Sequence, residues 1–267
     1  MSRPGVGGHV ARKRFGQHFL TDASVIRRIV DAIAPQPQDT LIEIGPGLGA
    51  LTFPLLDRVP RMHAIEIDRD IVARLRGEFP EVRLQVHLAD VLEFDFSGLG
   101  ADLRLVGNLP YNISTPILFH LAAHAHVMRD GHFMLQKEVV ERMAAEPGGS
   151  EYGRLTVMLR YRFGIDNLFE VGPEAFDPPP KVRSAVVRVW PLNPLPFRAD
   201  DEILLAQLVT RAFTQRRKTP AQCGQFVPFA RRTQSNRHQS RGSTGDAGGR
   251  AMGASRKRGF EAGERLK

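Results

Sequence analysis

Apolar residues recur with two spacings along this chain, and these spacings predict its elements. Apolar side chains three and four positions apart predict a helix over residues 22–34, which Pro35 ends. Thr21 or Asp22 is its expected cap. After this helix, short apolar runs alternate with amphipathic segments. The runs predict strands at 41–44, 62–67, 82–87, 103–106 and 132–135, and the segments predict helices at 50–56, 71–79, 117–125, 137–145 and 154–163. Such alternation is typical of βαβ units around a parallel sheet.

The pattern changes twice in the second half of the chain. Two further runs with strand character, 167–171 and 182–190, bracket a proline-rich segment at 177–180. The Pro-spaced stretch 191–196 indicates a linker, and one amphipathic helix is expected after it, over 201–214. Beyond Pro220 large apolar residues are scarce, so residues 220–267 are expected to be disordered.

Composition narrows the class of protein. None of the apolar stretches in the 267 residues approaches the roughly 18 needed to cross a bilayer. The first 17 residues are basic and glycine-rich, without the apolar core of a secretory signal. Cys223 is the single cysteine, which excludes an internal disulfide and favours a reducing compartment. A cytoplasmic protein is therefore expected.

The net charge of +8 is unevenly distributed. Residues 221–267 hold 10 Lys or Arg and 3 Asp or Glu, which leaves 27 basic and 26 acidic residues before them. Two local clusters remain, Arg12-Lys13-Arg14 and Arg216-Arg217-Lys218. Each is either an ordinary solvated run or a site for nucleic-acid phosphates.

Polar and glycine residues follow four successive predicted strands. The segment 43–49 (EIGPGLG) has G-x-G-x-G spacing instead of the G-x-G-x-x-G of dinucleotide-binding loops. Glu43 stands just before its first glycine, where a negatively charged pyrophosphate would be repelled. Glu66 can accept hydrogen bonds from ribose hydroxyls, and Asp90 from an adenine amino group. Each acid alone fits an ordinary turn or helix cap. Together with Gly45 and Asn108, they describe a site for S-adenosylmethionine.

The segment 108–111 (NLPY) has the residue types that hold a flat base. Asn108 offers its side-chain Oδ1, and Leu109 its backbone carbonyl, as hydrogen-bond acceptors for such a base. Pro110 stiffens the loop. Tyr111 can stack on the base. In isolation the same four residues fit a strand-ending turn.

With these residues assembled, the chain resembles the small-subunit (16S) ribosomal RNA adenine N6,N6-dimethyltransferases over about residues 11–219. Five segments carry the resemblance: 13–20 (KRFGQHFL), 43–49, 66–68 (EID), 108–111 and 176–184 (FDPPPKVRS). It implies an α/β, Rossmann-like class I S-adenosylmethionine-dependent methyltransferase with a small helical C-terminal appendage. The expected parts are a basic N-terminal arm (1–20), a methyltransferase domain (21–190), a linker with the start of the helical domain (191–219) and an atypical tail (220–267).

The resemblance also implies roles for residues and partners. His18 and Leu20 would close over the cofactor, although many members carry Asn at the position of His18, and Gly45 would contact the amino-acid part. Glu66, Asp90 and Asn108 would complete the pocket. Phe176 would enclose the base opposite Tyr111 or, alternatively, anchor the proline-rich loop in the core. No metal is implied.

The substrate implied is a pair of adjacent adenines in a hairpin loop near the 3′ end of 16S rRNA, in the small ribosomal subunit, methylated by a monomer. The two basic clusters would bind phosphates. After Thr219 the family continues with amphipathic helices, whereas the rise in Arg, Ser, Gly and Gln here resembles either translation in a shifted reading frame or a natural divergent tail. Impaired docking on the subunit is therefore expected.

Three other functions fit part of the sequence. Large-subunit adenine methyltransferases of the antibiotic-resistance type share the glycine loop and the 108–111 segment. A non-catalytic RNA-binding assembly factor would share the fold, but the intact Asn108, Tyr111, Glu66 and Asp90 oppose it. An NAD-dependent oxidoreductase is disfavoured by the glycine spacing.

Overall fold

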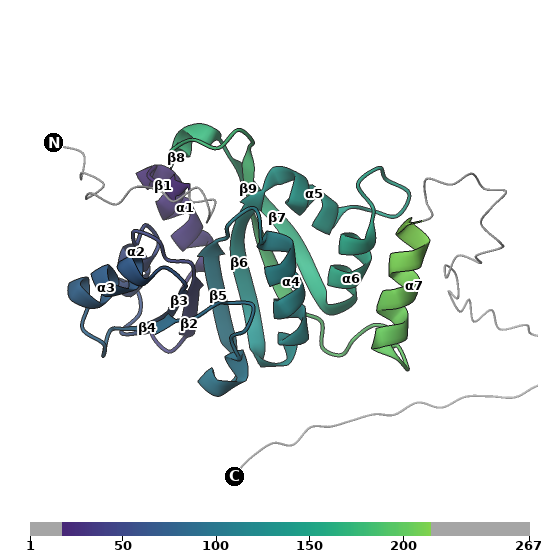
Figure 1. Ribbon diagram of the computed structural model, residues 1–267, viewed down its shortest axis with the longest axis horizontal. Helices are drawn as coiled ribbons and strands as arrows, with labels where there is room; N and C mark the ends of the chain where they lie inside the picture. Colours follow the sequence, from purple (N-terminus) through teal and green to yellow (C-terminus); the bar gives the residue numbers. More distant parts are fainter. Residues whose placement is uncertain (1–17, 215–267) are drawn as a thin grey trace, which may run out of the picture. The chain divides into compact units, whose positions relative to one another are not determined.

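The computed structural model describes residues 18–214, and these form a sheet covered by helices on both faces (Figure 1). The seven strands lie in the order β4-β3-β2-β5-β6-β9-β7. Their bounds are β2 Thr40–Ile44, β3 Met62–Glu66, β4 Leu84–Leu88, β5 Leu103–Asn108, β6 Met128–Gln136, β7 Phe163–Val171 and β9 Ser184–Pro191. Neighbouring strands are parallel from β4 to β6, whereas β9 runs antiparallel to both β6 and β7.

Alternate residues of the strands contribute side chains to two hydrophobic cores, one on each face of the sheet. Leu41 faces one core, which it shares with α1 (Ala23–Ile33), α2 (Thr52–Leu56) and α3 (Arg69–Glu78). Ile42 faces the other, with α4 (Ser114–Ala123), α5 (Lys137–Ala144) and α6 (Arg154–Arg162). This alternation follows from the two-residue period of a strand. The prediction of a parallel sheet flanked by helices is confirmed for β2 to β6, while β7 and β9 add an antiparallel part.

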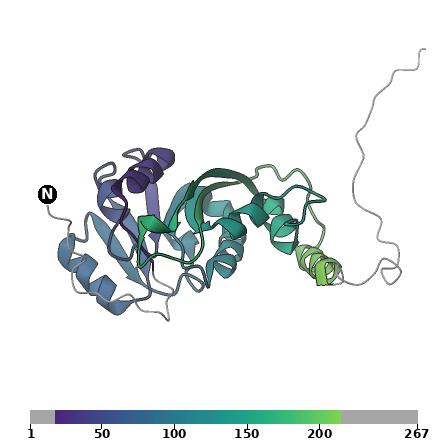
Figure 2. The ribbon, with the colours of Figure 1, turned by 90° about the horizontal axis from the view of Figure 1, so that it is seen from above.

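The remaining elements are short or lie at the end of the sheet. Single-turn helices occupy η2 (Phe96–Leu99), η3 (Ala125–Val127) and η4 (Pro173–Ala175). Helix α7 (Glu202–Thr214) packs against α6, at the end of the sheet remote from α3 (Figure 2). The helix expected over 201–214 is therefore present.

A two-stranded ribbon joins two segments that are far apart in the sequence. Strand β1 (Phe19–Leu20) runs antiparallel to β8 (Phe176–Asp177), with Leu20 opposite Phe176. The Thr21 NH donates to the Ala175 carbonyl at 2.8 Å and extends the connection. The sequence pattern did not predict this ribbon.

Several expected boundaries need correction. Asp22 caps α1, as predicted, and its Oδ1 accepts from the Ser24 NH at 2.7 Å. Helix α4 starts at Ser114, three residues before the expected start at 117, and its N-cap residue Ile113 makes no side-chain hydrogen bond. The Ser114 hydroxyl instead donates to the Tyr111 carbonyl at 3.2 Å. The expected disorder of 220–267 and both basic clusters lie outside the described residues.

Candidate active site

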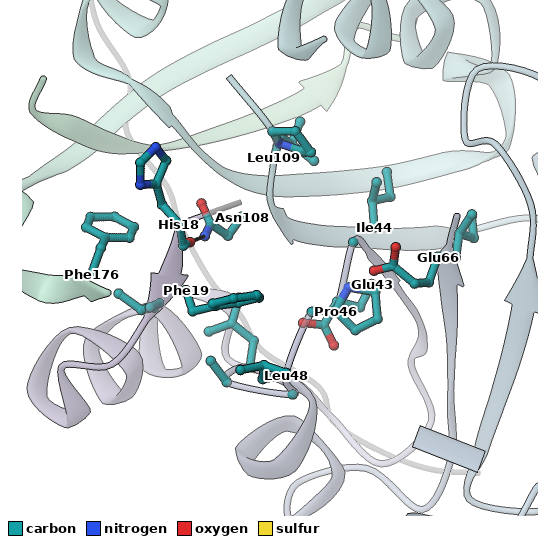
Figure 3. Close-up of a pocket in the computed structure, with 18 of the residues that line it drawn as sticks. His18, Phe19, Glu43, Ile44, Pro46, Leu48, Glu66, Asn108, Leu109 and Phe176 are labelled. Atoms are coloured by element: carbon teal, nitrogen blue, oxygen red, sulfur yellow. Dashed lines mark hydrogen bonds between the residues drawn. The ribbon is translucent and has the colours of Figure 1, made fainter. Parts of the chain in front are cut away.

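A cavity of about 1180 Å³ opens at the carboxyl ends of β2, β3, β4 and β5, beneath the β1–β8 ribbon. In a parallel sheet this crevice forms where strand order reverses, which here is between β2 and β5. Figure 3 shows Glu43 and Glu66 at one side of the cavity and His18, Asn108 and Phe176 at the other. Ten residues that the sequence predicted for the site line this cavity: His18, Leu20, Gly45, Glu66, Asp90, Asn108, Leu109, Pro110, Tyr111 and Phe176.

The glycine loop follows β2 and exposes backbone to the cavity. Gly45, Gly47 and Gly49 have φ values of +66°, +53° and +89°, which lie in the region that residues with a Cβ avoid. The Gly45 NH donates to the Ile65 carbonyl at 2.9 Å, which ties the loop to β3. The three glycines therefore present bare backbone to the cavity between the side chains of Pro46 and Leu48, and the loop is tied to the sheet.

Glu43 is a buried acid that the predicted set of site residues did not include. The Thr52 hydroxyl donates to its Oε2 at 2.6 Å, and burial raises the pKa of this carboxyl to about 7. At neutral pH the group is thus close to half protonated. The charge repulsion expected at this position is correspondingly weaker than that of a full carboxylate.

Glu66 ends β3 and is held by backbone groups. Its Oε1 accepts hydrogen bonds from the NH groups of Ile67 and Asp68, both at 2.9 Å. Burial raises the pKa of Glu66, while these NH groups favour its charged form and offset part of that rise. The carboxyl is therefore fixed in one orientation at the cavity.

Asp90 follows β4 and combines two roles. Its Oδ1 accepts from the Leu92 NH at 2.9 Å, as in an ordinary turn, and the residue also lines the cavity. The turn interpretation and the site interpretation are thus compatible, because one carboxylate has several acceptor positions.

Asn108 is the last residue of β5, so it lies in the strand and not in the loop after it. Its Nδ2 donates to the His18 carbonyl at 3.0 Å, which orients the amide. The Leu109 NH donates to the Met134 carbonyl at 3.1 Å and holds the next residue against β6. With the amide nitrogen engaged, Oδ1 is the atom of Asn108 that can serve as an acceptor.

Two aromatic residues stand at the same end of the cavity. The Tyr111 ring stacks on the His18 imidazole, with centroids 5.6 Å apart and planes 27° apart. His18 Nδ1 in turn donates to the Pro178 carbonyl at 2.7 Å. Phe176 is 4% exposed, belongs to one hydrophobic core and lines the cavity, so it is both a core anchor and part of the wall.

Two further residues shape the site without having been predicted in it. Phe19 packs against the loop, where a Cβ on Gly47 would lie 3.4 Å from its ring. Ser184 lies 2.6 Å from the Tyr111 hydroxyl. Both belong to segments that carried the family resemblance, which is the signal that could have found them. Within residues 18–214, His, Cys, Asp and Glu side chains form no group of three or more that could hold a metal ion.

The strand order, the glycine loop after the first sheet strand and the buried acid ending the second define a class I S-adenosylmethionine-dependent methyltransferase. The chain matches the family described as ribosomal RNA adenine dimethylase over residues 8–239, and it belongs to that family. The predicted fold class, enzyme class and methyl donor are confirmed.

Similar proteins agree with this assignment. The chain is 61% identical over 213 residues to ribosomal RNA small subunit methyltransferase A of Laribacter hongkongensis, a match that covers 79% of this chain and 81% of the relative. The protein of that name from Thiobacillus denitrificans is 60% identical over 211 residues, covering 79% and 83%.

Solved structures show the same fold at lower identity. A dimethyladenosine transferase from Plasmodium falciparum is 28% identical with a TM-score of 0.67, covering 76% of this chain and 73% of its own. The 23S rRNA methyltransferase ErmE is 27% identical with a TM-score of 0.62, covering 75% and 81%. The two structures are about equally similar to this chain, so they show the fold and do not distinguish between the two kinds of enzyme.

Proposed function

We propose that this chain methylates N6 of two adjacent adenines in a hairpin loop near the 3′ end of 16S rRNA, within the small ribosomal subunit. The observation that carries the proposal is a single cavity whose cofactor end and base end meet at Asn108. Similarity to small-subunit methyltransferases at about 60% identity supports the choice of RNA.

The residues at the cofactor end fit S-adenosylmethionine. Gly45 permits close approach of the amino-acid part, because the space that a Cβ would occupy is open, with no protein atom within 4 Å. Its φ of +66° also favours glycine. Glu66 is oriented to accept from the ribose hydroxyls, and Asp90 from the adenine amino group. His18 and Leu20, in and beside the ribbon, close over the cofactor from the other side of the cavity. When bound, the cofactor supplies an electrophilic methyl group.

The residues at the base end orient a weak nucleophile. An adenine N6 lone pair is delocalised into the ring, so the amine has to be held with that lone pair aimed at the methyl carbon. Asn108 Oδ1 and the Leu109 carbonyl accept the two N6 protons. Tyr111 stacks on the extruded base, Phe176 encloses it, and Pro110 keeps the connecting loop stiff.

The wider setting follows from the same proposal. The protein acts as a monomer in the cytoplasm, and Arg12-Lys13-Arg14 and Arg216-Arg217-Lys218 contact RNA phosphates. No helix among residues 18–214 has both the length and the apolar character needed to span a bilayer.

The decisive experiment supplies methyl-labelled S-adenosylmethionine and unmethylated small or large subunits, and then maps the labelled adenines. Label is expected at two adjacent adenines of small-subunit RNA. Asn108→Ala should lower the rate by about 100-fold or more, because it removes an acceptor for the reacting amine. Asn167→Ala, an exposed asparagine of β7 outside the cavity wall, is the matched control.

Other outcomes would identify the competing functions. Label confined to large-subunit RNA would indicate a methyltransferase of the antibiotic-resistance type. Binding of S-adenosylhomocysteine and subunits without any label would indicate a non-catalytic assembly factor. Either result contradicts the proposal.

A further inference from the structure

The Tyr111 hydroxyl is anchored away from the cofactor end of the cavity. It lies 2.6 Å from Ser184 Oγ, the short distance typical of a hydroxyl–hydroxyl hydrogen bond. Burial raises the pKa of the Tyr111 phenol above its ordinary value of 10, so the group stays protonated at neutral pH. Its role at this place is therefore that of a tether and not that of a base.

Ser184 offers a rigid attachment point. It is the first residue of β9, its exposure is 0%, and it pairs with Gln136 of β6 on one side and with Val171 of β7 on the other. A side chain with neighbours on both strands has little freedom to shift. The Ser184 hydroxyl is consequently held in a fixed place relative to the sheet, and so is the Tyr111 hydroxyl that it binds.

Few other contacts fix the Tyr111 ring. Its backbone carbonyl accepts from the Ser114 hydroxyl at 3.2 Å, but this bond leaves rotation of the side chain free. The His18 imidazole stacks on the ring with a 27° tilt, which constrains one face loosely. The hydrogen bond to Ser184 is thus the contact that fixes the direction of the ring axis, while stacking on His18 restrains rotation of the ring about that axis.

We propose that Ser184 is a positioning residue, whose hydroxyl fixes the axis of the Tyr111 ring and so keeps the ring where the target adenine stacks on it. The inference rests on the proposed function, because it takes Tyr111 to be a wall of the base site. If the ring tilts, the adenine tilts with it, and the N6 lone pair no longer points along the direction of methyl transfer. Ser184 therefore acts through Tyr111 and touches no reacting atom.

The test compares Tyr111→Phe, Ser184→Ala and the double variant of the full chain in methylation of unmethylated small subunits. Ser114→Ala is the matched control: this serine is also buried and also binds Tyr111, but through the backbone and not through the ring. Measurements are kcat, KM for subunits, Kd for S-adenosylhomocysteine and thermal stability.

Each single variant is expected to lower kcat by about fivefold or more, because a tilted base binds but reacts slowly. KM for subunits and Kd for S-adenosylhomocysteine should stay within about twofold of the original chain. The double variant should be no slower than the slower single variant, since both changes remove the same bond. Ser114→Ala should keep the original kcat.

An unchanged kcat in Tyr111→Phe would overturn the proposal, as would losses that multiply in the double variant. Tyr111→Phe also decides the matter if Ser184→Ala does not fold. Tyr111→Ala separates this proposal from the assignment of the base site. If the alanine variant is slow and the phenylalanine variant normal, the role of Ser184 fails. If both are normal, Tyr111 is not a wall of the base site.

Discussion

Two carboxyl groups, Glu43 and Glu66, are buried at the ends of neighbouring strands, and burial raises the pKa of both. They differ in their partners. Glu43 receives one hydrogen bond, from the Thr52 hydroxyl, whereas Glu66 receives two from backbone NH groups. A carboxylate with several NH donors keeps its charge more easily. Glu66 is therefore the better acceptor, and Glu43 is the acid whose protonation changes near neutral pH.

The first prediction concerns the pH dependence of stability. The pKa of Glu43 rises from 4.5 to about 7 in the folded protein, so the folded state keeps a proton that the unfolded chain releases. The raised pKa of Glu43 therefore adds to the free energy of unfolding at low pH. This added stability is fully present below pH 4.5 and is lost as the pH rises through about 7, and its full size is about 3 kcal/mol.

Glu43→Gln should remove this loss and flatten the stability curve over that range, as measured by urea unfolding at several pH values. The exposed Glu81→Gln is the control and should leave the slope as it is. An equal slope in the original chain and Glu43→Gln would contradict the raised pKa.

At the scale of elements, periodicity predicted every strand of the main sheet, but several boundaries were displaced. Strand β6 was expected at 132–135 and begins at Met128. Its early residues include Asp130, which is unusual within a strand. The buried guanidinium of Arg104 donates to Asp130 Oδ1 at 2.9 Å and to Asp39 Oδ2 at 2.7 Å. This network of tertiary contacts stabilises a charged residue that local sequence would exclude from a strand.

The candidate site was more predictable than the ribbon that covers it. Gly45, Glu66, Asp90 and Asn108 lie at the ends of recognisable strands or just after them, and carboxyl ends of parallel strands meet at one edge. The β1–β8 ribbon has two residues on each side, too few to show a period. The Tyr111–Ser184 bond was equally hidden, because side-chain pairing between distant segments leaves no local pattern.

Gly107 provides a prediction about how β5 meets β2. A Cβ at this position would lie 2.5 Å from the Ile44 carbonyl oxygen, a backbone atom that cannot move aside by rotation. Gly107→Ala should therefore displace the end of β2 and the glycine loop. The expected results are a loss of about 1–3 kcal/mol in stability and weaker binding of S-adenosylhomocysteine, measured by thermal unfolding and calorimetry.

Gly77→Ala is the matched control, because a Cβ there would meet nothing within 4 Å and the residue lies in α3. This change should stabilise the protein by about 0.5–1 kcal/mol and leave cofactor binding as it is. Equal effects of the two substitutions would show that the predicted crowding at Gly107 has no consequence.

At the scale of the whole molecule, the sequence pattern separates the catalytic part from the C-terminal segment. The relatives at about 60% identity match 79% of this chain. The atypical composition of 220–267 led to the expectation of impaired docking. Replacing residues 215–267 by the C-terminal segment of the Laribacter hongkongensis relative tests this expectation directly.

The chimera should methylate small subunits about tenfold faster or more, which corresponds to about 1.4 kcal/mol of recovered interaction with the substrate. Kd for S-adenosylhomocysteine should not change, because the cavity lies within the retained part. Equal rates for the chimera and the original chain would show that the tail does not impair docking.

The β1–β8 ribbon has a consequence for synthesis of the chain. His18 and Pro178 are 160 positions apart, yet they are hydrogen-bonded across the mouth of the cavity. Contacts between such distant segments form only after the intervening elements have folded, because closing a long loop costs chain entropy. A nascent chain therefore lacks a closed cavity until Asp177 has left the ribosome and paired with Phe19. Methylation is therefore expected to begin only after residues 176–177 have been synthesised.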